Sequence, residues 1–455
     1  MPDTPPILAE AEVRLWGDTV GALVELASGR IVFEYAEAFR RRGLEISPLH
    51  LPTTLAGPVS FEELRRKDSF RGLPGVLADA LPDAFGRRVI RAWYAARGMP
   101  DRGLSPVQQL LYVGERAIGA LAFHPAEEPG PAGEEALELQ ALALGASQVV
   151  RGRTEVAVPE IYRIGSSAGG RRPKAIVHFD PQAGTLRSGG VPAAPGEVSC
   201  LLKFDGIGDD HDADELGAPK PWNRIEAAYG DMARAAGIDM PRLEILEADG
   251  YAHLLVPRFD VGAGEGGGPP ASVDPGQPAG ERSSARAHPA RLHQHTLGGL
   301  LHVDYNDVGA SSYEEYFRTI QVLGMAYDAL AEGFRRMAFN VLAVNQDDHV
   351  KNLSFHMDGG GAWRLAPAYD VTFARGEGFT RTHQMRVRGK LEGIGMEDLL
   401  AVAAEFGIKR AAEIVSRVRE VLAGWEACAE RRGVPEAAAE AIRRELDARA
   451  REAAG

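Results

Sequence analysis

The sequence is poor in cysteine and in long apolar runs, and each shortage excludes a class of protein. Only two cysteines, Cys200 and Cys428, occur in 455 residues, so neither a disulfide framework nor a cysteine metal site is expected. No stretch reaches the roughly eighteen uninterrupted apolar residues of a membrane-spanning helix. The first six residues also lack the basic and apolar regions of a signal peptide, so we expect a cytoplasmic protein without a membrane partner.

Positive charge, and lysine in particular, is also scarce. The 51 basic residues are outnumbered by 64 acidic ones, which gives a formal net charge of −13 at pH 7. Because phosphate contacts need a basic face, broad nucleic-acid binding by this chain alone is not expected. Where lysines are so few, one inside an apolar strand is less readily explained as solubilising charge. The lysines are Lys67, Lys174, Lys203, Lys220, Lys351, Lys390 and Lys409.

The composition is that of a globular protein, and the length calls for more than one core. Hydrophobic residues make up 45% of the chain and charged residues 25%, and 455 residues exceed an ordinary single domain, so we expect two or three. Alternating apolar patterns predict two strands within residues 13–23 and further strands at 29–35, 117–123, 161–164, 175–179, 198–204 and 251–256. Helical periodicity predicts helices over residues 82–97, 136–150 and 224–236, and a mainly helical region after the Gly/Pro/Ser-rich stretch 262–286, which is expected to be a mobile surface loop.

Two acidic residues and an amide near residue 350 have a spacing that phosphoryl transfer uses. Asp347 is followed by four residues and then Asn352, the interval of the kinase catalytic loop, in which Asp orients the accepting hydroxyl and Asn holds a magnesium ion. An apolar run, a Gly-rich turn at residues 358–361 and a second apolar run then predict a hairpin. Because a hairpin returns the chain to its starting point, we expect Asp370 to lie beside Asn352 as a second magnesium ligand.

A glycine-rich loop and a strand lysine precede this acidic set. Backbone amides of a loop such as 165–174, with three glycines, can cradle phosphate oxygens, although an ordinary hairpin loop is the alternative. Lys203 falls in an apolar strand after that loop, where kinases place the lysine that pairs with the phosphates. Glu226, on the next predicted helix, is the expected ion-pair partner. The alternatives are an edge-strand lysine that points to water and a solvated helix face for the glutamate.

The chain that leaves the strand at 251–256 has the position of a kinase hinge, whose backbone groups bind adenine. The hinge residues would be Val256, Pro257, Arg258 and Phe259. Pro257 can offer only its carbonyl, and a simple strand-to-loop turn explains the stretch equally well. His349 could be a structural histidine or part of a metal site. The ordered series of Gly-rich loop, strand lysine, helix glutamate, hinge, Asp-x4-Asn and Asp nevertheless favours a kinase.

Six stretches spread over nearly the whole length complete the pattern. They are Leu15-Trp16-Gly17-Asp18-Thr19-Val20-Gly21, Leu81-Pro82-Asp83, Ser166-Ser167-Ala168-Gly169-Gly170-Arg171-Arg172-Pro173-Lys174-Ala175, Arg258-Phe259-Asp260, Asp347-Asp348-His349-Val350-Lys351-Asn352 and Leu365-Ala366-Pro367-Ala368-Tyr369-Asp370-Val371. In these stretches the chain resembles the HipA family, the toxin kinases of bacterial type II toxin–antitoxin modules. The last two stretches are the specific ones, and the N-terminal ones support them.

The resemblance implies an ATP- and Mg²⁺-dependent serine/threonine protein kinase. Its fold would be of the α+β class, two-lobed and related to protein kinases and phosphatidylinositol kinases, with an N-terminal β-rich subdomain. By the same resemblance Asp347 would orient the acceptor hydroxyl, Asn352 and Asp370 would bind magnesium, and Lys203 would neutralise the phosphates. The other nucleotide-binding residues would be Ala168, Gly169, Gly170, Lys174, Val256, Pro257, Arg258, Phe259, His349, Lys351 and Tyr369.

The resemblance also implies regulation and partners. HipA-like kinases phosphorylate a serine of their own Gly-rich loop, for which Ser166 is the best match and Ser167 the next. A phosphate there would repel the phosphates of ATP, which is a physical reason for inhibition. The expected partners are a helix-turn-helix antitoxin of the HipB type, through which alone DNA is contacted, and a protein substrate, an aminoacyl-tRNA synthetase. The chain departs from the family pattern at Arg171-Arg172-Pro173 and in the insert 262–286.

We predict four regions and keep two further classes of function in view. The regions are an N-terminal HipA-type β-rich subdomain at 1–125, a nucleotide-binding lobe at 126–260, a low-complexity insert at 261–290 and a helical lobe with the catalytic loop at 291–455. A small-molecule phosphotransferase or an adenylyl transferase would use the same ATP site. A catalytically inactive module that co-represses an operon with its antitoxin is the other alternative, and the intact acidic set argues against it.

Overall fold

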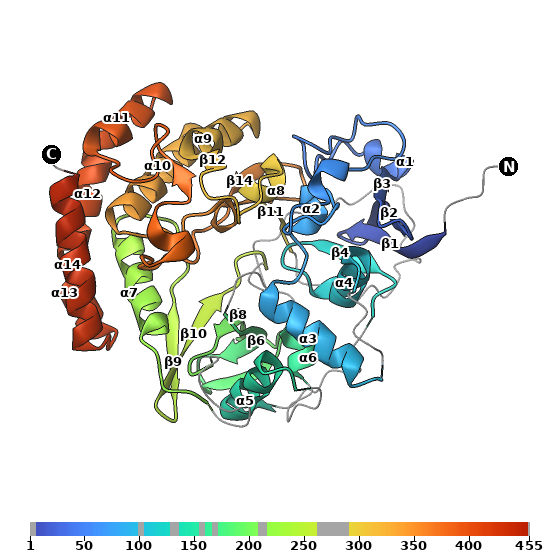
Figure 1. Ribbon diagram of the computed structural model, residues 1–455, viewed down its shortest axis with the longest axis horizontal. Helices are drawn as coiled ribbons and strands as arrows, with labels where there is room; N and C mark the ends of the chain where they lie inside the picture. The colour runs from blue at the N-terminus through green and yellow to red at the C-terminus, as the bar shows by residue number, and fades with distance from the viewer. Residues whose placement is uncertain are drawn as a thin grey trace.

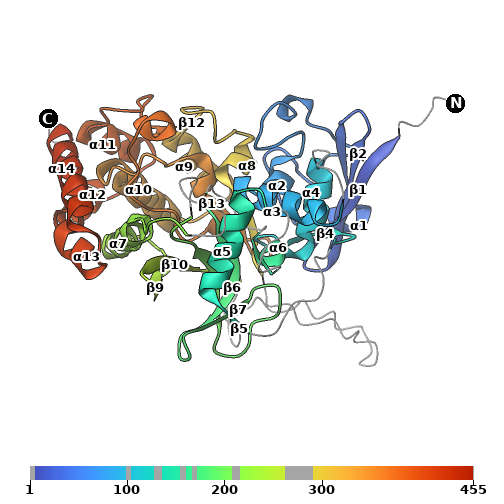
Figure 2. The ribbon, with the colours of Figure 1, turned by 60° about the horizontal axis from the view of Figure 1, so that its bottom comes forward.

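The computed structural model runs from a β-rich N-terminal region at one end to a stack of helices at the other, with a six-stranded sheet between them (Figures 1 and 2). It describes residues 6–98, 104–127, 136–153, 160–165, 172–207, 216–261 and 291–453. The predicted insert 262–286 lies outside the described residues, as do Ser166, Ser167, Ala168, Gly169 and Gly170 of the Gly-rich loop.

An antiparallel sheet organises the N-terminal region, as the alternating sequence predicts. Its strands, in hydrogen-bonded order, are β3 (Ile31–Tyr35), β2 (Asp18–Leu26), β1 (Ile7–Leu15) and β4 (Leu121–His124). The strand expected over residues 117–123 is therefore shorter and begins later than predicted. The region also contains α1 (Glu37–Arg40), η1 (Glu62–Leu64), α2 (Gly75–Ala78), α4 (Pro106–Val113) and η2 (Gly114–Arg116).

A six-stranded antiparallel sheet forms the predicted nucleotide lobe. Its order is β5 (Ala136–Leu137), β7 (Thr185–Ser188), β6 (Lys174–Asp180), β8 (Val198–Lys203), β10 (Tyr251–Pro257) and β9 (Glu244–Ala248). The helices around it are α3 (Ala84–Ala95), α5 (Leu139–Val150) and α6 (Ile161–Ile164) on one side and α7 (Trp222–Ala235) on the other (Figure 1). The prediction of a strand at 161–164 is wrong, because a run of four residues is too short to distinguish helical from strand periodicity.

Helix α3 precedes this lobe in sequence but packs against its sheet. The side chain of Asp83 accepts a hydrogen bond from the backbone N–H of Gly86 and so caps the helix, which begins close to where Pro82-Asp83 predicts. Phe85 and Val89 of α3 share a buried core with strand residues such as Ala175. The start of α3 is therefore held against the start of β6. The four regional boundaries remain predictions.

The helical lobe carries the predicted hairpin. Strands β13 (Ser354–Met357) and β14 (Trp363–Leu365) pair antiparallel, and β11 (His293–Thr296) pairs with β13. The other elements are α8 (Leu297–Leu301), β12 (Ser311–Ser312), α9 (Tyr313–Val322), α10 (Tyr327–Leu342), η3 (Val350–Asn352), η4 (Gly378–Arg381), β15 (Met385–Arg386), α11 (Met396–Glu405), α12 (Ala411–Ala423), α13 (Trp425–Arg431) and α14 (Glu436–Glu452). Within the described ranges, no helix combines the length and the apolar character needed to cross a membrane.

Candidate functional site

The strand lysine lies between two carboxylates. Lys203 Nζ is 2.5 Å from Glu226 Oε1 on α7 and 2.5 Å from Asp370 Oδ1, which follows β14. The side chains of Lys203 and Glu226 are 8% and 5% exposed, so a lysine that points to water and a solvated glutamate are both excluded. Burial lowers the pKa of Lys203, but the two carboxylates outweigh burial and raise the pKa above its ordinary value. The ammonium group therefore stays protonated.

Asp370 is the acid that the hairpin brings to this lysine. Its backbone has a φ of 53°, in the left-handed region that aspartate adopts more readily than most residues. Loss of contact with water raises the pKa of the Asp370 carboxyl, but the charges of Lys203 and Lys174 lower it to about 2. The group is therefore ionised at neutral pH. The side chain is still 35% exposed, and Asp370 lines one small cavity together with Asn352. The side-chain oxygens of Asp370 and Asn352 therefore lie at a small cavity beside Lys203.

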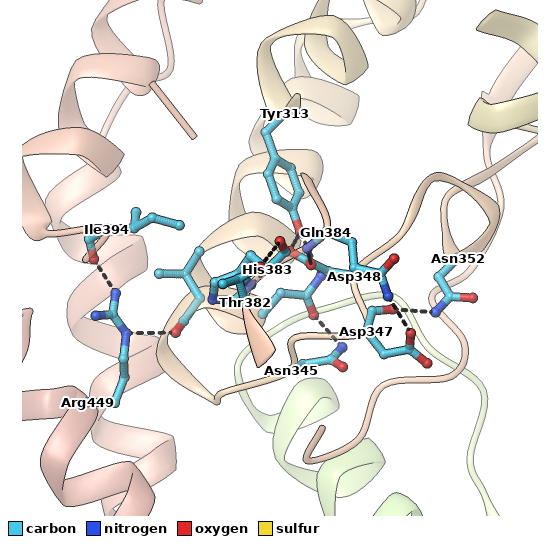
Figure 3. Close-up of polar contacts among 12 residues, drawn as sticks. Tyr313, Asn345, Asp347, Asp348, Asn352, Thr382, His383, Gln384, Ile394 and Arg449 are labelled. Atoms are coloured by element: carbon cyan, nitrogen blue, oxygen red, sulfur yellow. Dashed lines mark hydrogen bonds and ion pairs between the residues drawn. The ribbon is translucent and has the colours of Figure 1, made fainter. Parts of the chain in front are cut away.

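The predicted catalytic loop exposes one aspartate and buries the next (Figure 3). The side chain of Asp347 is 45% exposed, whereas that of Asp348 is fully buried. Asn352 Nδ2 donates to the backbone carbonyl of Asp347 at 2.8 Å, which closes the loop between them. Gln384 Nε2 donates to Asp347 Oδ1 at 2.8 Å and orients the exposed carboxylate.

Asp348 anchors this loop to the helical lobe, a role that the sequence analysis does not assign. Its Oδ2 accepts a hydrogen bond from the Tyr313 hydroxyl at 2.9 Å and lies 3.0 Å from His383 Nδ1, and its Oδ1 accepts from the backbone N–H of Gln384 at 2.8 Å. Because the side chain of Gln384 also contacts Asp347, the two acids are coupled through one residue. Residues 346–349 belong to neither a helix nor a strand, so no periodicity in the sequence indicates which of the two aspartates is buried.

His349 and Lys351 both lie close to the ring of one tyrosine, Tyr305. The ring of His349 is 5.2 Å from that of Tyr305, and Lys351 Nζ is 5.3 Å from the same ring. Burial lowers the pKa of His349, whose Nε2 is 3.9 Å from Asp347 Oδ1. In the part of the chain that the structure describes, no group of three or more His, Cys, Asp and Glu is arranged to hold a metal, so the metal-site alternative for His349 gains no support.

The predicted hinge is a strand end with its own internal bonds. Val256 and Pro257 end β10, and the backbone N–H of Arg258 donates to the carbonyl of Ser199 at 2.8 Å. The guanidinium group of Arg258 pairs with Asp260 at 2.5 Å. The N–H of Arg258 and its guanidinium group are thus engaged by the protein itself.

Phe259 and Tyr369 form an aromatic wall between the hinge and the hairpin. Their ring centroids are 5.6 Å apart. The Tyr369 hydroxyl donates to the backbone carbonyl of Lys351 at 2.6 Å, so the wall is tied to the catalytic loop. An aromatic wall of this kind offers a flat apolar surface to a base.

A second buried lysine lies beside the first. Lys174 begins β6 directly opposite Lys203 on β8. Its Nζ is 3.3 Å from Asp83 Oδ2, and the two side chains are 4% and 7% exposed. Burial lowers the pKa of Lys174 by more than the charges of Asp83 and Asp370 raise it. Asp83 belongs to the Leu81-Pro82-Asp83 motif, to which the sequence analysis assigns no role.

This geometry joins a lysine–glutamate pair on a β-sheet lobe to an acidic loop on a helical lobe. It defines a two-lobed protein of the protein-kinase-like class. The chain belongs to the HipA family, because its sequence matches the HipA-like C-terminal domain over residues 166–425 and the HipA N-terminal domain over residues 11–124.

Two similar proteins agree with this assignment. A protein of Sinorhizobium fredii named "Putative kinase Y4dM" is 26% identical over 459 residues, which cover 95% of each chain. A chain in the complex of the Shewanella oneidensis MR-1 toxin–antitoxin system HipA, HipB and its operator DNA is similar with a TM-score of 0.63 at 18% identity, over 96% of each chain. At that identity the second likeness shows the fold alone. The predicted fold class and the resemblance to the HipA family are confirmed.

Proposed function

We propose that the protein is an ATP- and magnesium-dependent serine/threonine protein kinase that acts as the toxin of a type II toxin–antitoxin module. The observation that carries this proposal is Lys203, held 2.5 Å from both Glu226 and Asp370. Protein kinases need this lysine–glutamate pair and a magnesium-binding aspartate in place at the same time. Membership of the HipA family supports the same activity.

The oxygen donors of Asn352 and Asp370 fit a magnesium ion. Magnesium prefers hard oxygen ligands and binds through one or two carboxylates together with phosphate oxygens. Asp370 is ionised, since its pKa is about 2, and it is partly exposed. Because the amide nitrogen of Asn352 donates to the carbonyl of Asp347, the amide oxygen is the atom that would bind the ion. Magnesium held there would neutralise charge on the phosphate that is transferred.

The remaining residues have separate tasks. The carboxylate of Asp347 is exposed and oriented by Gln384, so it would accept the hydrogen of a serine or threonine hydroxyl and direct its oxygen toward the phosphate. Lys203, kept protonated by its carboxylates, would bind phosphate oxygens. Phe259 and Tyr369 would contact the base.

The sequence and the family membership support a proposal for the regulation and the partners of the protein. Ser166, and next to it Ser167, would be the site of an autophosphorylation that blocks ATP binding; both lie outside the described residues. The partner would be a helix-turn-helix antitoxin like the HipB of the Shewanella complex, and DNA would be contacted through it, in keeping with the net charge of −13. The protein substrate would be an aminoacyl-tRNA synthetase in the cytoplasm.

The test compares wild-type protein, never phosphorylated during expression, with Asp347→Ala. Each is incubated with magnesium and γ-labelled ATP, alone and with a panel of aminoacyl-tRNA synthetases, and the phosphorylated residues are mapped. We expect label on Ser166 or Ser167 and on one synthetase with the wild type only, because removal of the carboxylate leaves the hydroxyl without its orienting group. Circular dichroism checks that the variant is folded.

Other outcomes point to the alternatives. Full activity of Asp347→Ala would refute the role of Asp347. Adenylyl groups on protein would favour an adenylyl transferase, and a phosphorylated metabolite would favour a small-molecule phosphotransferase. The absence of both γ-label and adenylyl groups in every wild-type sample would favour the inactive co-repressor.

A further inference from the structure

Two buried ammonium groups converge on the acid that would bind magnesium. Lys174 and Lys203 are direct cross-strand partners on β6 and β8, so their side chains leave the same face of the sheet. Lys203 touches Asp370, and the charge of Lys174 also acts on that carboxylate. Like charges at opposite positions of two strands repel each other. Their placement is understandable if a polyanion such as a triphosphate binds between them.

Asp83 holds the second of these lysines from the N-terminal region. Its Oδ2 is 3.3 Å from Lys174 Nζ, and its Oδ1 accepts the N–H of Gly86 at 2.6 Å in the first turn of α3. The helix N-terminus therefore fixes one oxygen while the other faces the ammonium. Because Phe85 of α3 packs in one core with Ala175, the residue after Lys174, the carboxylate is fixed relative to the strand as well.

We propose that Asp83 is a positioning residue of the nucleotide site, which holds the ammonium group of Lys174 where the phosphates of ATP bind. The inference rests on the proposed kinase function and adds to it a residue from outside the two kinase-like lobes. A lysine ends in a flexible four-carbon stem, and ordering that stem before the ligand arrives lowers the entropic cost of binding. The motif Leu81-Pro82-Asp83 thereby makes the N-terminal region part of the ATP site.

Asp83 also favours the protonated form of Lys174. The charged groups that act on Lys174 are Asp83 from the start of α3, Asp370 from the end of the hairpin and Lys203 from β8. Burial and Lys203 disfavour the protonated form, whereas the two carboxylates favour it, with Asp83 the stronger. Without Asp83, Lys174 would therefore lose its proton at a lower pH than in the wild type.

The test is the affinity of the full-length, phosphatase-treated protein for ATP with magnesium, measured by calorimetry on wild type and Asp83→Asn. Asparagine caps a helix as well as aspartate does, so this variant keeps the cap and loses only the charge. We expect the Kd for ATP to rise by about tenfold to a hundredfold, the range of a charge-assisted hydrogen bond. The KM for ATP should rise in the same proportion with little change in kcat. An unchanged or lower Kd would overturn the proposal.

Two further variants separate positioning from a structural effect. If Asp83 acts only through Lys174, Asp83→Asn added to Lys174→Met should weaken binding no further than Lys174→Met alone, whereas additive losses would refute the role. Glu197→Gln is the matched control, since it removes a carboxylate from an ion pair with Arg187 at 2.6 Å on the neighbouring strand β7. It should bind ATP as the wild type does, and a weakening equal to that of Asp83→Asn would also refute the role.

A pH series gives an independent readout. In Asp83→Asn the alkaline loss of ATP affinity should begin at lower pH than in the wild type, which a loss of packing alone would not cause. A wild-type protein that does not bind ATP with magnesium would overturn the kinase proposal and this inference with it. A wild type that binds, with Asp83→Asn binding equally well, would refute the positioning role alone.

Discussion

Lys203 and Lys174 are the same residue type at opposite positions of two paired strands, yet their pKa values shift in opposite directions. Lys203 has two carboxylate oxygens at 2.5 Å, whereas Lys174 has that of Asp83 at 3.3 Å. Burial lowers the pKa of both lysines, and only at Lys203 do the carboxylates outweigh it. The number and closeness of the acids, rather than burial, decide the charge of these two buried lysines.

The acids around the two lysines also come from different parts of the chain. Glu226 and Asp370 lie within residues 166–425, which match the HipA-like C-terminal domain, as does Lys203 itself. Asp83 lies within residues 11–124, which match the HipA N-terminal domain. The surroundings of Lys203 are thus complete within the kinase-like lobes, whereas those of Lys174 require the N-terminal domain.

Removal of each lysine should have the largest effects on stability and activity, and the two effects should differ. Lys203→Met leaves Glu226 buried without a cation, which costs about 3–5 kcal/mol of the free energy of unfolding, and it should also reduce phosphoryl transfer by about a hundredfold or more. Lys174→Met should cost less, because burial raises the pKa of Asp83 and the loss of the Lys174 charge raises it further, which favours the neutral form of this carboxyl. Urea unfolding and kinase assays of the two variants measure the difference. Equal losses of stability in the two variants would contradict the conclusion that the number and closeness of the neighbouring acids distinguish the two lysines.

Glu226→Gln should have a smaller effect, because it makes Lys203 a lysine with one carboxylate, like Lys174. The amide keeps the shape and removes the charge, so we expect ATP binding about tenfold weaker and a stability loss of about 1–3 kcal/mol. Calorimetry and urea unfolding measure both. Asp231→Asn is the matched control on the same helix, since Asp231 pairs at 2.7 Å with Arg432, the residue that follows α13, and its ATP affinity should stay within about twofold of the wild type. An unchanged affinity in Glu226→Gln would argue that Asp370 alone holds the lysine.

The smallest expected effect is the change of ATP affinity as the pH rises. The pKa of Lys174 lies below the ordinary value of 10.5 and that of Lys203 above it, so Lys174 loses its proton first as the pH rises. Since only the protonated ammonium attracts phosphates, ATP affinity should be constant below the pKa of Lys174 and fall by at most about tenfold per pH unit above it. In Lys174→Arg the guanidinium stays charged, and this fall should disappear. Its persistence in that variant would assign it to another group.

The parts of the site that lie close together in sequence were predictable. The Gly-rich turn at 358–361 predicts the hairpin, which is confirmed, and the interval from Asp347 to Asn352 predicts a kinase catalytic loop, which stays a prediction; both depend on local spacing. The strand expected at 161–164 is a helix, and the one at 117–123 is shorter, because short apolar runs carry little information on periodicity.

Residues that act through distant partners could not be found in this way. Gln384 reaches Asp347 and Asp348 from a segment that carries no motif. Asp83 stands in a recognisable motif, but its partner Lys174 lies on β6, which follows α3, α4, α5 and α6 in the chain. Only packing brings such pairs together, so neither spacing nor composition indicates them.

By itself the sequence determined the fold class, the family and the acidic loop, because periodicity and motif spacing are properties of the chain. The tertiary structure alone decided which aspartate of the pair Asp347-Asp348 is exposed and which acid faces each lysine. Those outcomes depend on burial and on charges contributed by remote segments, α3 for Lys174 and the end of the hairpin for Lys203. The charged groups close to a lysine in the folded protein determine its protonation, and the sequence alone does not show which groups these are.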